Sequence, residues 1–320
     1  MSSVHSTDIA AMDVGGTHVT AAMVEPRSRS VVAGQSFREP LNADGSAEEI
    51  LSALVRCGSR LAAGPGTHWA VAVPGPFDYE RGIARYAAVG KFDALYGVDV
   101  RAALLSHLPG AAGASFYNDA QAFLAGEWWA GAARGHDRAV GITLGTGVGS
   151  SFLRDGRTVH EDEGPGVPPE GRVDLLRYEG LPLEETVSRR AIRRAYSGAA
   201  SAPGAAGAAH AAGAAPGIDV RQIAERARAG DPIAVDVLSH AFRALGTVLG
   251  PCLAAFEPTV LVVGGSIAAS WDLVAGPLRD GLAGTGSSTA PACKLERAHH
   301  LADAPLLGAA HLAAESRTAS

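Results

Sequence analysis

The 320-residue sequence has little of what marks several classes of protein. Its only cysteines, Cys57, Cys252 and Cys293, are too widely spaced for a disulfide framework or a thiolate zinc cluster. Lys and Arg (27) do not outnumber Asp and Glu (33), so the basic surface of a nucleic-acid-binding protein is missing. No signal-peptide pattern opens the chain, and no uninterrupted apolar run approaches the about 20 residues that span a bilayer. We expect a cytoplasmic protein with reduced thiols and with neither nucleic acid nor membrane as a partner.

What is present is the composition of a globular protein, with 47% hydrophobic and 19% charged residues. Short apolar runs that end in Gly or Pro alternate with segments of helical periodicity, such as residues 46–63, which predicts an α/β fold. The hairpin pattern of residues 9–24 recurs about 130 residues later in RAVGITLGTGVGSSFLRDG, and this duplication predicts two related lobes. Residues 197–217 contain almost only Ala, Gly, Pro and Ser, which predicts a flexible surface insertion.

The first candidate site is the stretch MDVGGTHV, where Asp13, Gly15, Gly16 and Thr17 interrupt an apolar strand. Glycines at such a turn let backbone N–H groups approach a phosphate, and a nearby carboxylate can hold a hydrated magnesium ion. The alternative is that these residues only form a tight hairpin.

Two further glycine turns follow. TLGTGVGSS offers the backbone of Gly145 and Gly147 and the hydroxyl of Thr146 to phosphate, and VVGGS places Gly264 and Gly265 where a strand meets a helix. TLGTGVGSS fits neither a dinucleotide fingerprint nor a Walker loop. Close packing of a helix on a strand would explain Gly264 and Gly265 equally well.

The polar pair Asn118 and Asp119 lies between a strand and a helix in YNDAQAFLAGE. A carboxylate at that position can accept a proton from a hydroxyl group. The competing interpretation is that Asp119 only caps the helix, because Asp is among the commonest N-cap residues.

Taken together and in this order, the motifs resemble those of the ROK family of sugar kinases, in the superfamily of hexokinase, actin and the heat-shock ATPases. DVGGTHVTAA is similar to its first phosphate motif, TLGTGVG to its second and LVVGGSI to its adenosine motif. VPGPFDYERG resembles its Pro-Gly-Pro segment below the sugar, and NDAQAFLAGEWWAGAARG its catalytic helix. The resemblance spans nearly the whole chain.

The resemblance implies a two-lobed actin-like ATPase (ribonuclease H-like) fold with an interlobe cleft. We expect a small N-terminal α/β lobe over residues 1–117, a larger lobe over 118–304, and a C-terminal helix at about 305–320 that packs back on the first lobe. The implied partners are ATP with Mg²⁺ and a small polyhydroxylated substrate; whether the chain forms a homodimer stays open.

The resemblance also implies a role for each site residue. Asp119 would be the general base, and Asn118, Gly75 and Glu184 would contact substrate. Asp13 would position magnesium, through water, while phosphates would bind at Gly15, Gly16, Thr17, Gly145, Thr146, Gly147, Gly264 and Gly265. These roles suit phosphoryl transfer, which depends mostly on positioning and charge neutralisation.

The chain departs from the family pattern where a Glu, a His and a cysteine-rich zinc loop are usual. Ungapped counting places Pro168 and Gly171 at the Glu and His positions, a two-residue shift offers Glu170 as the substrate ligand, and zinc is not expected. Lys91 replaces a common Asn, and we favour a solvated loop for it. C7-cyclitol phosphorylation is the leading alternative to a hexose, and a non-catalytic sugar-binding protein is a further one. A sugar-sensing repressor is disfavoured, because only 12 residues precede Asp13.

Overall fold

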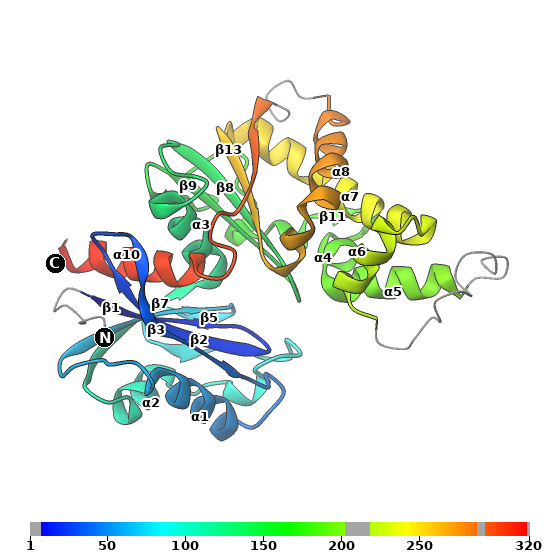
Figure 1. Cartoon of the computed structure of the whole chain (residues 1–320). Helices are drawn as coiled ribbons and strands as arrows, with labels where there is room; N and C mark the ends of the chain where they lie inside the picture. Colours follow the sequence, from blue (N-terminus) through cyan, green and yellow to red (C-terminus); the bar gives the residue numbers. More distant parts are fainter. Residues whose placement is uncertain (1–7, 202–217, 287–291, 319–320) are drawn as a thin grey trace. The chain divides into compact units, whose positions relative to one another are not determined.

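The computed structural model describes residues 8–201, 218–286 and 292–318. The chain divides into two compact units (Figure 1). Unit 1 comprises Met1–Gly135 and Ala302–Ser320, and unit 2 comprises His136–Leu301. All three cysteines are free thiols; Cys57 and Cys293 are buried, whereas Cys252 is only partly buried.

Unit 1 is built on a five-stranded sheet of order β3-β2-β1-β4-β7. Its strands are β1 (Ile9–Val14), β2 (His18–Glu25), β3 (Ser30–Pro40), β4 (Thr67–Val73) and β7 (Ala111–Asn118). Strand β2 runs antiparallel to both β1 and β3, and β1, β4 and β7 are parallel. The parallel strands therefore end at one edge of the sheet, which is where ligands bind in many α/β proteins.

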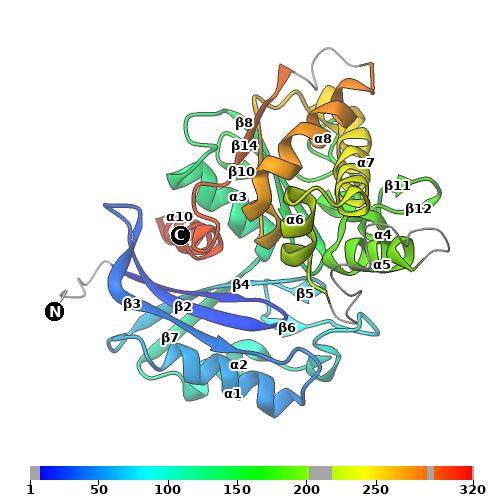
Figure 2. The ribbon, with the colours of Figure 1, turned by 45° about the vertical axis from the view of Figure 1, so that its right-hand side comes forward.

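Helices cover both faces of this sheet (Figures 1 and 2). Helices α1 (Ala47–Gly58) and α2 (Val100–His107) pack on one face, and α3 (Asp119–Ala130) and α10 (Ala304–Thr318) on the other. Smaller elements join them: β5 (Phe77–Asp78), β6 (Ile83–Ala84) and η1 (Asp93–Leu95). Burial from both sides explains why β1 and β4 are nearly continuous apolar runs.

Helices α3 and α10 lie unusually close together because each carries a glycine at the contact. A Cβ atom on Gly308 would lie 1.7 Å from the Ala122 carbonyl oxygen, and one on Gly126 would lie 2.0 Å from that of Ala304. No larger side chain fits at either position without displacing a helix. The helix that begins with Asp119 is therefore firmly docked on α10.

Unit 2 repeats the sheet of unit 1, with the order β10-β9-β8-β13-β14 and the same pattern of antiparallel and parallel pairs. Its strands are β8 (Arg138–Leu144), β9 (Val148–Arg154), β10 (Arg157–Thr158), β13 (Val260–Gly264) and β14 (Lys294–Arg297), and β11 (Arg177–Tyr178) pairs with β12 (Leu181–Pro182). Its helices are η2 (Pro169–Gly171), η3 (Val173–Leu175), α4 (Glu184–Val187), α5 (Arg189–Ala200), α6 (Val220–Arg228), α7 (Pro232–Phe256), η5 (Ser266–Ser270) and α8 (Trp271–Ala283). The repeated topology agrees with the duplication expected from the two hairpin patterns.

The long helix α7 is the core helix of unit 2. It is long and apolar enough to cross a membrane by length and composition. However, Phe242, Leu245 and Leu249 are buried in one cluster with the β8 residues Val140 and Ile142. Pro251 lies inside α7, where we expected a kink, and the helix continues past it to Phe256.

Two expected boundaries differ from the structure. We placed the end of the first lobe at residue 117, whereas unit 1 continues to Gly135, because α3 packs on α10 and on the sheet of unit 1. The expected insertion at 197–217 overlaps α5, which continues to Ala200 because Ser188 caps it and Ile192 and Tyr196 are buried. The rest of that segment, 202–217, lies outside the described residues.

Candidate active site

The strand register of unit 1 places Asp13 on the face of the sheet that α3 covers. Asp13 pairs with Ala72 of β4. Ala72 packs with Ala122 of α3, and Ala11, two residues before Asp13, packs against α10. Because side chains alternate along a strand, the Asp13 carboxylate emerges on the α3 side, at the edge where the parallel strands end.

Asn118, and not Asp119, is the N-cap of α3. The Asn118 Oδ1 accepts hydrogen bonds from the backbone N–H groups of Ala120 (3.0 Å) and Gln121 (3.2 Å). Asp119 is the first residue of the helix, and its Oδ1 accepts from the N–H of Ala120 at 2.9 Å. The capping interpretation of Asp119 is therefore wrong, and its carboxylate is available for another role.

Burial raises the pKa of both carboxyl groups. The pKa of Asp13 rises to about 7, because burial and the nearby Asp119 charge raise it more than Arg38 lowers it. Burial also raises the pKa of Asp119, against the opposing effects of Lys91 and of the Ala120 N–H. Two mutually repelling carboxylates at one sheet edge form a donor set that suits a hydrated divalent cation, so the residues fit Mg²⁺.

Lys91 lies near Asp119, because its positive charge lowers the pKa of that carboxyl group. The neighbouring Phe92 anchors it: Phe92 is buried and its N–H donates to the Ala43 carbonyl oxygen at 2.7 Å. Lys91 is itself partly buried. Lys91 thus lies on a loop with exposed neighbours at 87–90, as we favoured, but it is partly buried and close to Asp119.

Tyr79 connects the Pro-Gly-Pro segment to Asn118. The Asn118 Nδ2 donates to the Tyr79 hydroxyl oxygen at 3.0 Å, and that hydroxyl donates to the Val73 carbonyl oxygen at 3.4 Å. A Cβ on Gly75 would lie 3.3 Å from the same hydroxyl. Sequence reasoning missed Tyr79, although it lies inside the quoted segment.

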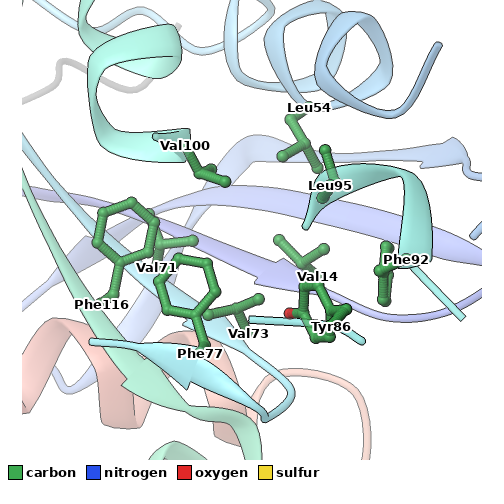
Figure 3. A pocket seen from close by; sticks show the side chains of 10 residues that line it. All are labelled: Val14, Leu54, Val71, Val73, Phe77, Tyr86, Phe92, Leu95, Val100 and Phe116. Carbon is green, nitrogen blue, oxygen red and sulfur yellow. The ribbon is translucent and has the colours of Figure 1, made fainter. Parts of the chain in front are cut away.

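A cluster of apolar side chains, which begins with Phe77 directly after the Pro-Gly-Pro segment, packs beside this loop (Figure 3). Phe77 packs against Phe116 with a ring-centroid distance of 5.1 Å, and Tyr86 packs against Phe92 at 5.2 Å. The Tyr86 hydroxyl donates to the Pro74 carbonyl oxygen at 2.7 Å. The cavity between these side chains measures only about 10 Å³, about the space of one water molecule. The side chains beside the loop are therefore closely packed.

The turn between β1 and β2 is a closed hairpin. The Gly15 N–H donates to the His18 carbonyl oxygen at 2.9 Å, and the Gly16 carbonyl oxygen accepts from the Ala43 N–H at 3.2 Å. Thr17 is exposed. The structure thus confirms that these residues form a tight hairpin. Phosphate binding at Gly15, Gly16 and Thr17 stays a prediction.

In unit 2, parallel pairing of β8 and β13 brings the second and third glycine turns to the same edge of the sheet. Gly265 has φ +81° and a Cβ there would lie 2.3 Å from the Leu144 carbonyl oxygen, so the position requires glycine. Arg189 joins the turns: its backbone N–H donates to the Gly145 carbonyl oxygen at 2.9 Å, and its guanidinium donates to the Ser266 Oγ at 2.8 Å.

The basic cluster around Arg189 has two distinct parts. Arg190 and Arg194 form ion pairs with Glu185 on an exposed face of the helix. Arg189 and Arg193 are instead partly buried, and the Arg193 Nε donates to the Ile218 carbonyl oxygen at 2.7 Å. The signal for Arg189 in the sequence was its position directly after Ser188, which caps α5.

The two acidic residues expected to contact substrate from unit 2 have different surroundings. Glu184 begins α4, and its Oε2 would lie 3.2 Å from a Cβ on Gly147, so it borders the second phosphate motif. Glu170 is exposed in a left-handed conformation, with φ 54°. The hydrogen bond with the buried Asp174 raises the pKa of Arg172, and the charges of Asp174, Glu170 and Glu184 raise it further. Substrate contacts of Glu170 and Glu184 stay predictions.

Two units with the same mixed five-stranded sheet define the α/β class of the actin-like ATPases and the related sugar kinases. A family model described as "ROK family" matches residues 9–316. The chain therefore belongs to the ROK family.

Several relatives with assigned activities are similar over most of the chain. A glucokinase from Thermotoga maritima is 26% identical over 84% of this chain and 85% of its own. A β-glucoside kinase from Klebsiella pneumoniae is 28% identical over 81% of this chain and 82% of its own. The crystal structure of a ROK family glucokinase from Streptomyces griseus, in complex with glucose and AMPPNP, is 26% identical, with a TM-score of 0.77 and coverage of 96% of this chain and 99% of that one.

Proposed function

We propose that this protein transfers the γ-phosphoryl group of ATP to a hydroxyl group of a hexose-like substrate. The observation that carries the proposal is the carboxylate of Asp119, which begins α3 beside Asp13 while Asn118 caps the helix. The sugar-kinase activities of the relatives from Thermotoga and Klebsiella support the same reaction class.

Asp119 acts as the general base. The acceptor oxygen forms a bond to the γ-phosphorus, the bond from that phosphorus to the ADP oxygen breaks, and the acceptor proton passes to the Asp119 carboxylate. Because the transition state of phosphoryl transfer is loose, the base must mainly orient the hydroxyl group. Tyr79 holds Asn118 in place beside it.

Asp13 would hold hydrated Mg²⁺, which neutralises negative charge on the ATP phosphates when bound. For unit 2 we propose the nucleotide contacts: the backbone at Gly145, Gly147 and Gly265 and the hydroxyl of Thr146. The AMPPNP complex of the Streptomyces griseus glucokinase supports a nucleotide role for the shared fold. Arg189 fixes the two turns relative to each other.

The acceptor is the least constrained part of the proposal. The glucokinases among the relatives favour glucose as the acceptor. However, Gly171 stands where the family pattern has a His, and it offers no side chain to a sugar hydroxyl. A pocket without that polar partner discriminates less strongly among hydroxyl patterns. This single feature favours keeping C7 cyclitols among the candidate acceptors.

The test is acceptor-dependent ADP release from Mg-ATP across a panel of hexoses, N-acetylhexosamines and C7 cyclitols. We expect at least one acceptor to support turnover, and Asp119→Asn to lower it by about 10²- to 10⁴-fold. Asp44→Asn, an exposed acidic position of unit 1, is the matched control and should keep native activity. Folded protein that releases no ADP with any acceptor would instead favour a non-catalytic sugar-binding role.

A further inference from the structure

A second pocket, of about 350 Å³, lies in unit 1 at the C-terminal end of α3. Its wall includes Trp128 and Trp129 of α3, His311 and Glu315 of α10, and the arginines Arg29 and Arg134. Asp119 is at the opposite end of α3, and a helix of 12 residues rises about 18 Å. The pocket is therefore separate from the candidate active site.

Arg29 lies in a strained turn between β2 and β3, and its side chain lines the pocket. It has φ 54°, an uncommon backbone conformation for a residue other than glycine. One guanidinium N–H donates to the Trp129 carbonyl oxygen at 2.9 Å, and the guanidinium lies 5.9 Å from the Trp129 ring centroid. These contacts hold the Arg29 charge at the pocket wall.

His311 and the two tryptophans form an aromatic wall. The His311 ring stacks on Trp129 at 5.1 Å with an interplanar angle of 10°, and its centroid lies 5.9 Å from that of Trp128. His311 is only 8% exposed, and its Nε2 has no hydrogen-bond partner in the part of the chain that the structure describes. Glu315 approaches that nitrogen no closer than 3.6 Å.

These groups define the chemistry of a ligand. Two guanidinium groups against one carboxylate leave a net positive wall, which suits a phosphate or carboxylate group. Trp128 adds an aromatic ring to the lining. The buried imidazole nitrogen of His311 without a hydrogen bond is a polar group that a ligand can satisfy. The volume lies at the lower end of the range for small-molecule sites.

We propose that this pocket binds a small anion that carries a flat ring, with the anionic group on Arg29 and Arg134 and the ring against Trp128. A nucleoside monophosphate and a simple aromatic phosphate share this chemistry. The proposal does not depend on the identity of the sugar acceptor.

Isothermal titration calorimetry of the full chain with phenyl phosphate tests the proposal, with inorganic phosphate and phenol as arms that carry only the charge or only the ring. We expect one site per chain with a dissociation constant of about 1 mM or tighter for phenyl phosphate, and at least about tenfold weaker binding of the two fragments. AMP in a further arm, titrated with a saturating non-hydrolysable ATP analogue present, distinguishes a nucleotide from a simple aromatic anion. No saturable binding of phenyl phosphate would overturn the proposal.

Two variants locate the binding. Arg29→Gln and, independently, Trp128→Leu should each weaken phenyl phosphate binding at least about tenfold. Arg27→Gln, an exposed arginine of the same turn, and Asp119→Asn should leave it unchanged. Because Arg29 also contacts the end of α3, thermal unfolding of each variant is recorded, and Trp128→Leu decides the outcome if Arg29→Gln does not fold. Binding that survives both pocket variants, or that Asp119→Asn abolishes, would contradict the assignment.

Discussion

Asn118 and Asp119 are adjacent in sequence but have different roles in the structure. The Asn118 side chain satisfies two N–H groups at the start of α3, which a helix otherwise leaves without partners. Asp119 therefore does not need to cap the helix, although its own carboxylate accepts from Ala120. Sequence preference alone could not separate the two, since Asn and Asp are comparable N-cap residues.

Lys91 gives a prediction about the acid limb of the pH–rate profile. Its charge lowers the pKa of Asp119, so Lys91→Met should raise that pKa further. A general base must be ionised, and the acid limb of kcat/KM should therefore move to higher pH, with the larger loss of activity on the acid side. Lys91→Arg keeps the charge and should retain the native profile. An unchanged profile in Lys91→Met would show that Asp119 does not set that limb.

Asp13 predicts how stability depends on pH. Its pKa is raised from 3.8 to about 7 in the folded protein, so between these values the folded state holds a proton that the unfolded chain has released. By linkage, this group makes the free energy of unfolding fall as pH rises through about 4 to 7. Asp13→Asn should reduce the fall of Tm across this pH window. Asp119, whose pKa is also raised, should account for part of the remaining fall of Tm. If the Tm of Asp13→Asn depended on pH as the Tm of the native protein and of the control Asp44→Asn does, this prediction would be contradicted.

At the scale of elements, the sequence predicted the existence of the strands and helices better than their partners. The hairpins and the glycine turns follow from local patterns, because Gly and Pro end strands wherever they occur. The contact between α3 and α10 involves residues about 180 positions apart, and nothing local to Gly126 or Gly308 indicates it. For the same reason the first boundary was placed before α3, at residue 117, although α3 packs in unit 1.

Gly308 tests the close packing of α3 on α10. Ala at this position would bring a Cβ to 1.7 Å from the Ala122 carbonyl oxygen. The helices must separate, and we expect Gly308→Ala to lower the free energy of unfolding by about 1–3 kcal/mol. The control is Gly198→Ala in α5, where no atom lies within 4 Å, which should be neutral or stabilising by up to about 1 kcal/mol. Equal stability of the two variants in chemical denaturation would refute the tight contact.

At the scale of the whole molecule, the two units share one sheet topology but carry different chemistry. Unit 1 contains the carboxylates Asp13 and Asp119, and unit 2 contains the glycine turns that Arg189 joins. The duplicated hairpins predicted two related lobes, but the expected boundary after residue 117 placed Asp119 in the second lobe, whereas it lies in unit 1 with Asp13. The side chains that hold the sites together were not predictable: Tyr79, Lys91 and Arg189 act through contacts that depend on how distant segments pack.

This division predicts that variants separate by substrate. Arg189→Gln removes the link to Ser266 and should raise the KM for ATP about tenfold while changing the KM of the acceptor little. Tyr79→Phe removes the acceptor of the hydrogen bond from the Asn118 Nδ2. It should raise the KM of the acceptor substrate while changing the KM for ATP little. Arg190→Gln, on the exposed face of α5, is the matched control for charge. Steady-state kinetics with each substrate varied in turn would show the pattern, and a rise of both KM values in either variant would argue against it.

The role of Asp119 as general base is tested by a single-turnover measurement in which ATP and a saturating acceptor are mixed with excess enzyme. If Asp119 is the general base, Asp119→Asn should bind both ligands with nearly native affinity by calorimetry, yet transfer the phosphoryl group about 10²- to 10⁴-fold more slowly. A native transfer rate in Asp119→Asn would contradict this role, because no base chemistry would then depend on the carboxylate that begins α3.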